Sequence, residues 1–398
     1  MVSLYKNLPM KFIIRIVVAM LLLLYIGPEK VFAQQSPSDQ ANDAGLRHFN
    51  LGDYASAITT WENLLRNDPN YAKREEVWYS IAKAAILQKS QPGNEKAIEY
   101  LDKIITLKNV NGQYYGQSLF LIGETLFLQA EQRYETDELV QARAYAIEAK
   151  KHFDLLLTEI PDSPNRPQVL FYQTQIAVKY LQSAVETKKY AELAMDNKYC
   201  KFYYAWAIGQ LGEEAKARGY FWEFISNRDP DIGPMSLYEL AHTYYRAGDY
   251  QKTLTELNSF RNFFPNDTPE TRKASLNVQR LQAMCLLHTQ KYSEAAEQMD
   301  QMIRQLESRK ENPMVEDYIF LAFCYTRIPD FSKADGLISL LENNYGNSTF
   351  ADTINLLRAA YFAGLEQHRQ AWIHNNRLHH QQSTTAPAWS SSSSSCFK

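Results

Sequence analysis

The chain has few of the features that mark enzymes, nucleic-acid-binding proteins or disulfide-rich domains. It has only four cysteines in 398 residues, too few for a disulfide framework. It contains no His-Glu-x-x-His motif, nucleophile elbow or phosphate-binding glycine loop, so we expect no enzyme activity, catalytic residue, metal or cofactor. Basic residues occur only as scattered pairs such as Lys150-Lys151, whereas duplex-DNA binding needs a basic face. Nucleic-acid binding is therefore not expected.

The sequence also lacks a hydrophobic run long enough to cross a membrane. The longest run near the start, residues 16–26, has 11 residues, against the roughly 20 that a transmembrane helix needs. Lys6 and Lys11 precede this run, and Val31-Phe32-Ala33 follows with small residues at positions −3 and −1 of a cleavage point. Residues 1–33 are therefore predicted to be a signal peptide, with an uncleaved signal anchor as the alternative. We expect an exported protein, in the periplasm or cell envelope of a bacterium or secreted by a eukaryote, with no transmembrane segment after cleavage.

Two segments about 200 residues apart carry the same residues at the same spacing. Gly52-Asp53-Tyr54 recurs as Gly248-Asp249-Tyr250, and a small residue lies nine positions before each tyrosine. This spacing matches the 34-residue small-x2-Y…A-x3-F…P pattern, so the chain resembles the tetratricopeptide repeat (TPR) superfamily. The positions assigned to the repeat are Gly45, Tyr54, Ala57, Trp61, Pro69, Ala241, Tyr250 and Pro265.

The resemblance implies an all-α, right-handed superhelix of about seven to eight helix pairs, possibly in two blocks. The expected organisation is an N-terminal TPR block at 34–160, a proline-rich link at 161–167, a C-terminal TPR block at 168–378 and a disordered serine-rich tail at 379–398. The first repeat is placed at 38–71 and the second at 75–108, with Gln91-Pro92-Gly93-Asn94 as a long inter-helix loop. Residues 168–195 are helical but fit no repeat register, and a helix at 352–364 is expected to cap the stack. Buried free thiols are the favoured state of Cys285 and Cys324.

The links between repeats point to a narrower family. Ile160-Pro161-Asp162-Ser163-Pro164 and Phe264-Pro265-Asn266-Asp267 resemble the links of bacterial envelope TPR proteins of the BamD and CpoB type. That resemblance implies a non-enzymatic scaffold or adaptor in an envelope assembly, with other envelope proteins as partners. The residue directly after the predicted cleavage point is Gln34, and the first cysteine is Cys200, so the lipid-anchored cysteine of BamD-like proteins has no counterpart here.

Candidate partner-binding residues follow from the same resemblance. In TPR proteins the first helix of each repeat lines a concave groove through its second, fifth, ninth, twelfth and thirteenth positions. In this chain, the candidates at or next to those positions are Phe202, Trp206, Tyr238, His242, Tyr245, Arg246, Arg280, Met284, Phe323 and Arg327. Aromatic, methionine and arginine side chains are common at protein interfaces. The arginines slightly favour acidic or C-terminal groups. Two alternatives stay open: the positions are packed between repeats, or the rings stack on the sugars of a glycan.

Overall fold

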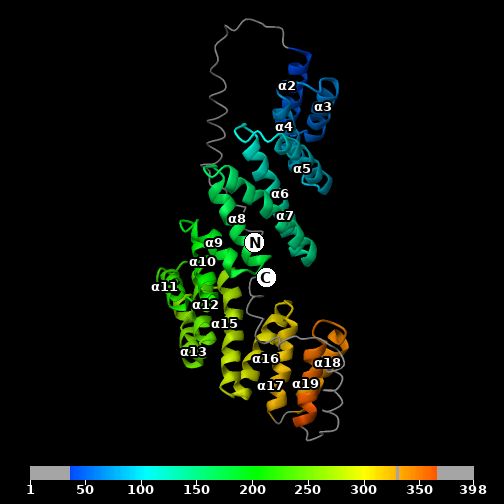
Figure 1. Ribbon diagram of the computed structural model, residues 1–398. Helices are drawn as coiled ribbons and strands as arrows, with labels where there is room; N and C mark the ends of the chain where they lie inside the picture. The colour runs from blue at the N-terminus through cyan, green and yellow to red at the C-terminus, as the bar shows by residue number, and fades with distance from the viewer. Residues whose placement is uncertain (1–35, 329–330, 365–398) are drawn as a thin grey trace. The chain divides into compact units, whose positions relative to one another are not determined.

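The computed structural model describes residues 36–328 and 331–364, and every regular element in these ranges is a helix. The predicted signal peptide and serine-rich tail lie outside the described residues. The helices are α2 (Pro37–Asn50), α3 (Tyr54–Asn67), α4 (Arg74–Leu87), α5 (Gln91–Thr106), α6 (Tyr115–Glu135), α7 (Leu139–Glu159), α8 (Arg166–Lys179), α9 (Ala184–Glu192), α10 (Lys198–Gln210), α11 (Glu214–Ser226), α12 (Gly233–Arg246), α13 (Tyr250–Asn258), α14 (Phe260–Phe263), α15 (Pro269–His288), α16 (Tyr292–Ser308), α17 (Val315–Arg327), α18 (Phe331–Tyr345) and α19 (Ala351–Gly364) (Figure 1).

Consecutive helices pack as antiparallel pairs, which confirms the predicted all-α repeat fold. The pairs α2/α3, α4/α5, α8/α9, α10/α11, α12/α13, α15/α16 and α17/α18 are each in contact, and Gly123 of α6 lies against the ring of Phe153 on α7. The last helix, α19, packs on both α17 and α18. None of the helices in the described ranges combines the length and the apolar character needed to cross a membrane.

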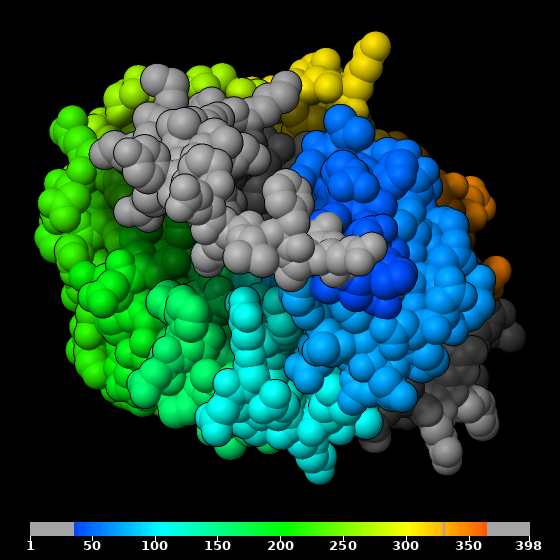
Figure 2. All heavy atoms as spheres, turned by 90° about the horizontal axis from the view of Figure 1, so that it is seen from above, coloured from blue at the N-terminus to red at the C-terminus, as the bar shows by residue number. Residues whose placement is uncertain are grey.

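The chain divides into two compact units between Ile122 and Gly123, within α6. The proline-rich stretch 161–167 lies further along, in the loop between α7 and α8 and in the first residues of α8. In the space-filling view, residues of the second unit drawn in green pack closely against one another along the left of the picture (Figure 2).

The first repeat shows how the shared residues build a helix pair. Gly52 has a φ of +78°, a left-handed conformation that glycine adopts without a steric cost, and the Asp53 side chain then caps α3 by accepting the Ser56 N–H. Gly45 on α2 lies against the indole of Trp61 on α3, where a Cβ atom would be 2.3 Å from Nε1. Trp61 is fully buried, and its Nε1 donates to Asn42 across the pair at 2.9 Å.

The same turn recurs in the second unit. Gly248 also has a φ of +78°, and Asp249 caps α13 by accepting the Lys252 N–H at 2.9 Å. Ala241 on α12 is fully buried, as expected for the small residue of the repeat. The two Gly-Asp-Tyr segments therefore have the same backbone geometry for the same physical reason.

One local prediction differs from the structure, and one segment without a repeat register can now be assigned. Residues 91–94 are not a loop but the first turn of α5, because Ser90 caps the helix through the Gly93 N–H and a proline fits in a first turn, where its missing N–H is not needed. Residues 168–195 were expected to be helical without a repeat register. They belong to the pair α8 and α9, which residues 180–183 separate. The helix expected at 352–364 is present as α19, Ala351–Gly364.

The cysteines of the described residues are buried free thiols, as predicted for two of them. Cys200, Cys285 and Cys324 are each unpaired and fully buried. Burial raises the pKa of Cys285 and of Cys324 to about 12, so these thiols stay protonated at neutral pH.

Candidate partner-binding surface

The ten candidate residues all lie on first helices of consecutive pairs, from α10 to α17. They differ in how deeply their side chains are buried. Phe202 and Trp206 on α10 and Tyr238 and His242 on α12 are only 5–6 % exposed. The half-buried candidates are Tyr245 and Arg246 on α12, Arg280 and Met284 on α15 and Phe323 on α17, and Arg327 on α17 is exposed. The half-buried and exposed side chains are the ones that a partner reaches first.

A series of aromatic rings runs along α12 and continues onto α15. His242 stacks between Tyr238, at 5.7 Å between ring centroids, and Tyr245, at 5.9 Å. The spacing of four and three residues places these rings on one face of the helix. The Tyr245 hydroxyl lies 2.8 Å from Nε2 of the exposed His288, which in turn stacks on Tyr250 at 4.8 Å. We call these five residues the aromatic series.

The three candidate arginines are less free than the sequence suggests. Arg280 forms a two-pronged ion pair with Asp317 of α17, at 2.8 and 2.7 Å. The Nε of Arg246 lies 3.9 Å from the carboxylate of Glu214 on α11. The guanidinium of Arg327 lies over the ring of Phe323, 5.1 Å from its centroid. Two of the three therefore already face a carboxylate of the same chain.

A buried carboxylate, Glu239, lies beside the aromatic series. Its side chain is 6 % exposed and its Oε2 is 3.9 Å from Nδ1 of His242, which is equally buried. Burial raises the pKa of Glu239 to about 7 and lowers the pKa of His242 to about 4. The repeat pattern missed Glu239, since its sixth position is not among the groove positions. Its place in the sequence between the candidates Tyr238 and His242 is the signal that could have identified it.

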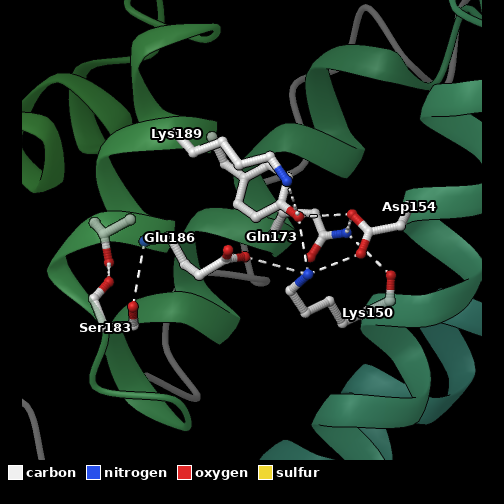
Figure 3. A network of polar contacts seen from close by, with 8 residues as sticks. Lys150, Asp154, Gln173, Ser183, Glu186 and Lys189 are labelled. Atoms are coloured by element: carbon white, nitrogen blue, oxygen red, sulfur yellow. Dashed lines mark hydrogen bonds and ion pairs between the residues drawn. The ribbon is translucent and has the colours of Figure 1, made fainter.

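A second polar cluster lies in α7, α8 and α9, away from the candidate residues (Figure 3). The hydroxyl of the buried Tyr190 donates to Asp154 at 2.6 Å and accepts from Lys150 at 2.9 Å. Lys150 also lies 3.2 Å from Glu186, and the fully buried Gln173 donates to Asp154 at 2.9 Å. Lys150 forms ion pairs with both Asp154 and Glu186, so the cluster joins the three helices α7, α8 and α9.

The described residues contain no group of three or more His, Cys, Asp or Glu side chains placed to hold a metal ion. Within the aromatic series, burial lowers the pKa of His242 and holds it neutral, and its ring lies against Tyr238, Tyr245 and the carboxylate of Glu239. The arrangement offers ring faces, one buried carboxylate and half-exposed apolar side chains. These are features of a binding surface.

No family model and no curated protein matches the chain. Several solved structures are similar to the chain in fold. The apo form of the quorum sensor NprR from B. thuringiensis is 14 % identical, with a TM-score of 0.50 over 86 % of this chain and 97 % of that one. A tetratricopeptide repeat protein from Parabacteroides merdae is 13 % identical, with a TM-score of 0.44 over 66 % and 94 %. The Rap protein complexed with Competence and Sporulation Factor is 15 % identical, with a TM-score of 0.42 over 86 % and 98 %.

At these identities the likeness concerns the fold. The chain is a TPR-like, all-helical repeat protein. The narrower resemblance to envelope proteins of the BamD and CpoB type stays a prediction.

Proposed function

We propose that this protein is a non-catalytic scaffold that binds an extended segment of a partner protein along α10, α12, α15 and α17. The aromatic series carries the proposal. It connects α12 with α15 through Tyr245 and the exposed His288, and His288 also stacks on Tyr250 at the start of α13. Solenoid repeats use such extended surfaces for binding, and ring faces give large contact area at a small entropy cost.

The proposal includes export and a place in an envelope assembly. This part is supported by the signal-peptide pattern of residues 1–33 and by the proline-containing links between repeats. The partners are then other proteins of the cell envelope. Comparison with the quorum sensor NprR supports only the fold of the scaffold.

Site-specific photo-crosslinking tests the surface. A photoreactive amino acid replaces Met284, next to the aromatic series, in the cells that make the protein. The control replaces Trp222, an exposed aromatic residue on the second helix α11, which is 47 % exposed. We expect a discrete crosslinked protein from position 284, its loss in a Tyr245→Ala background, and no such product from position 222. Equal products from the two positions would contradict the proposal.

A glycan is the second candidate ligand, because the stacked rings of Tyr250 and His288 are of the kind on which sugars lie. Retention on a polysaccharide column separates the two ideas. If Tyr250→Ala and His288→Ala abolish that retention and leave the crosslinked proteins unchanged, the glycan function replaces the protein-binding one.

A further inference from the structure

We propose that the first unit carries a second docking surface, centred on Lys83, which binds an acidic segment of a partner protein through the carboxylate of an aspartate or glutamate side chain. The surface consists of Phe49 of α2, Tyr79, Lys83 and Leu87 of α4, and Tyr114, directly before α6. We call these five residues the Lys83 surface. All of them belong to the compact unit that ends at Ile122, so the inference does not depend on the aromatic series of α12 and α15.

The ammonium group of Lys83 lies over two aromatic rings that come from different helices. Its Nζ is 5.8 Å from the ring centroid of Phe49 and 5.8 Å from that of Tyr79. A ring face attracts a cation at such a distance, so the two rings restrict the long side chain. A side chain that is already restricted loses less entropy when a partner pairs with it.

Lys83 also differs from other lysines of the same unit in its charge partners. Lys73, Lys96 and Lys103 each form an ion pair with a carboxylate. By contrast, no hydrogen bond or ion pair joins the Lys83 ammonium to another of the described residues, and the residue is exposed. A carboxylate of a partner therefore meets an accessible cation whose N–H donors are not used by the described residues.

The acidic residues of α4 lie at the opposite end of the helix. Glu75 and Glu76 are in its first turn, and Lys83 follows Glu76 by about two turns, or about 10 Å along the axis. Burial raises the pKa of Tyr114, and the charges of Glu76 and Glu75 add to that rise. The surface is therefore acidic near Tyr114 and basic at Lys83, so electrostatic complementarity directs an acidic group of a partner to the Lys83 end.

Apolar groups lie on both sides of Lys83 along α4. Tyr79 precedes it by four residues and Leu87 follows it by four, so the three side chains share one face of the helix. Tyr79 is half-buried, and Leu87 is 41 % exposed. A segment that continues past its carboxylate in both directions contacts both apolar groups, whereas a chain end contacts only one. This arrangement favours a side-chain carboxylate within a segment over a C-terminal carboxylate.

Three pools of short acetylated and amidated peptides test the inference. The central residue is glutamate in the first pool, glutamine in the second and lysine in the third; leucine flanks it on both sides and the outer residues are randomised. We expect the full chain to bind the glutamate pool about fivefold more tightly than the glutamine pool at low salt, as for one exposed charge pair. Added salt should weaken this preference, because it screens exposed charges.

Variants of the full chain assign the preference to Lys83. Lys83→Met keeps the apolar stem and should remove the preference for glutamate, whereas Lys83→Arg keeps the charge and should retain it. Lys108→Met, at another exposed lysine of the first unit, should leave the preference intact. A thermal midpoint of Lys83→Met equal to that of the unchanged protein establishes that the lost preference is not a loss of folding.

Several results would overturn the inference. These are equal binding of the three pools, a preference for the lysine pool, binding of no pool, and a preference for glutamate that survives Lys83→Met. A fourth pool, with glutamine at the centre and a free C-terminus, tests the source of the carboxylate. If only this pool binds in a way that needs Lys83, the surface takes a chain end and the side-chain proposal is wrong. None of these outcomes bears on the crosslinking from position 284, so the two proposals fail separately.

Discussion

The ion pair between Arg280 and Asp317 allows a sharp prediction about what holds α15 against α17. Asp317 is 3 % exposed in its side chain and Arg280 is 19 % exposed. The aspartate also accepts the backbone N–H of Met314 at 3.1 Å, which caps the start of α17. Arg280→Met keeps the apolar stem of the side chain and removes its charge. It leaves a buried carboxylate with one remaining donor.

The expected cost follows from this burial. Breaking a buried ion pair by removing one partner costs about 3–5 kcal/mol, because the other charge stays desolvated. We expect Arg280→Met to cost about 3 kcal/mol, at the lower end, since Asp317 keeps its contact with the Met314 N–H. Asp317→Asn alone should cost about 1–2 kcal/mol. In the Arg280→Met background the same asparagine should restore at least about 1 kcal/mol, because it removes the uncompensated charge.

Urea unfolding of the four proteins measures these free energies, and hydrogen exchange locates the effect. In a repeat protein each pair contacts mainly its neighbours, so exchange should rise in α17 and in α19, which packs on it, and stay unchanged in α2–α5. A cost of Arg280→Met below about 1 kcal/mol would refute the reasoning. So would an asparagine that destabilises both backgrounds equally.

Three further predictions concern single buried groups. Gly45→Ala places a Cβ atom 2.3 Å from the Trp61 indole and should cost about 1–3 kcal/mol in thermal unfolding, whereas Gly45→Ala with Trp61→Leu should cost less than the sum of the two changes. The folded-state pKa of Glu239 is raised from 4.5 to about 7, so the fold favours the protonated acid and its stability falls as pH rises from about 4.5 to 7; Glu239→Gln should remove this loss, on the order of 2–3 kcal/mol, and raise the thermal midpoint more at pH 8 than at pH 5. The folded-state pKa of His242 is lowered from 6.5 to about 4, so stability falls as pH drops below 6.5, and His242→Gln should flatten that acidic limb of the stability curve. An unchanged pH profile in either variant would contradict these assignments.

The helical repeats were predictable because their signals are local. Gly52 and Gly248 share a left-handed φ of +78°, and the aspartate that follows each one caps the next helix. These are properties of a few consecutive residues, so the spacing alone indicated them. The prediction was wrong at 91–94 for a related reason. Pro92 and Gly93 suggested a loop, but the cap at Ser90 allows both residues in a first helical turn.

The candidate surface was predictable only in part. The repeat register assigned the aromatic residues to first helices, and the structure places them there. It did not indicate that Arg280 would pair with an aspartate 37 residues later, or that Glu239 would lie buried without an ion-pair partner other than His242 among the described residues. Both facts depend on which groups a neighbouring helix presents, and repeat spacing carries no information about that.

The sequence by itself therefore determined the type of element, the pairing of consecutive helices and the geometry of the Gly-Asp-Tyr turns, because hydrophobic period, caps and glycine conformations act over one turn or one helix pair. Only the tertiary structure decided which charges are satisfied and which are not. That depends on desolvation and on distances of a few ångströms between side chains of different helices. On this surface, tertiary packing places two of the predicted arginines against acids of the same chain and buries Glu239 beside His242.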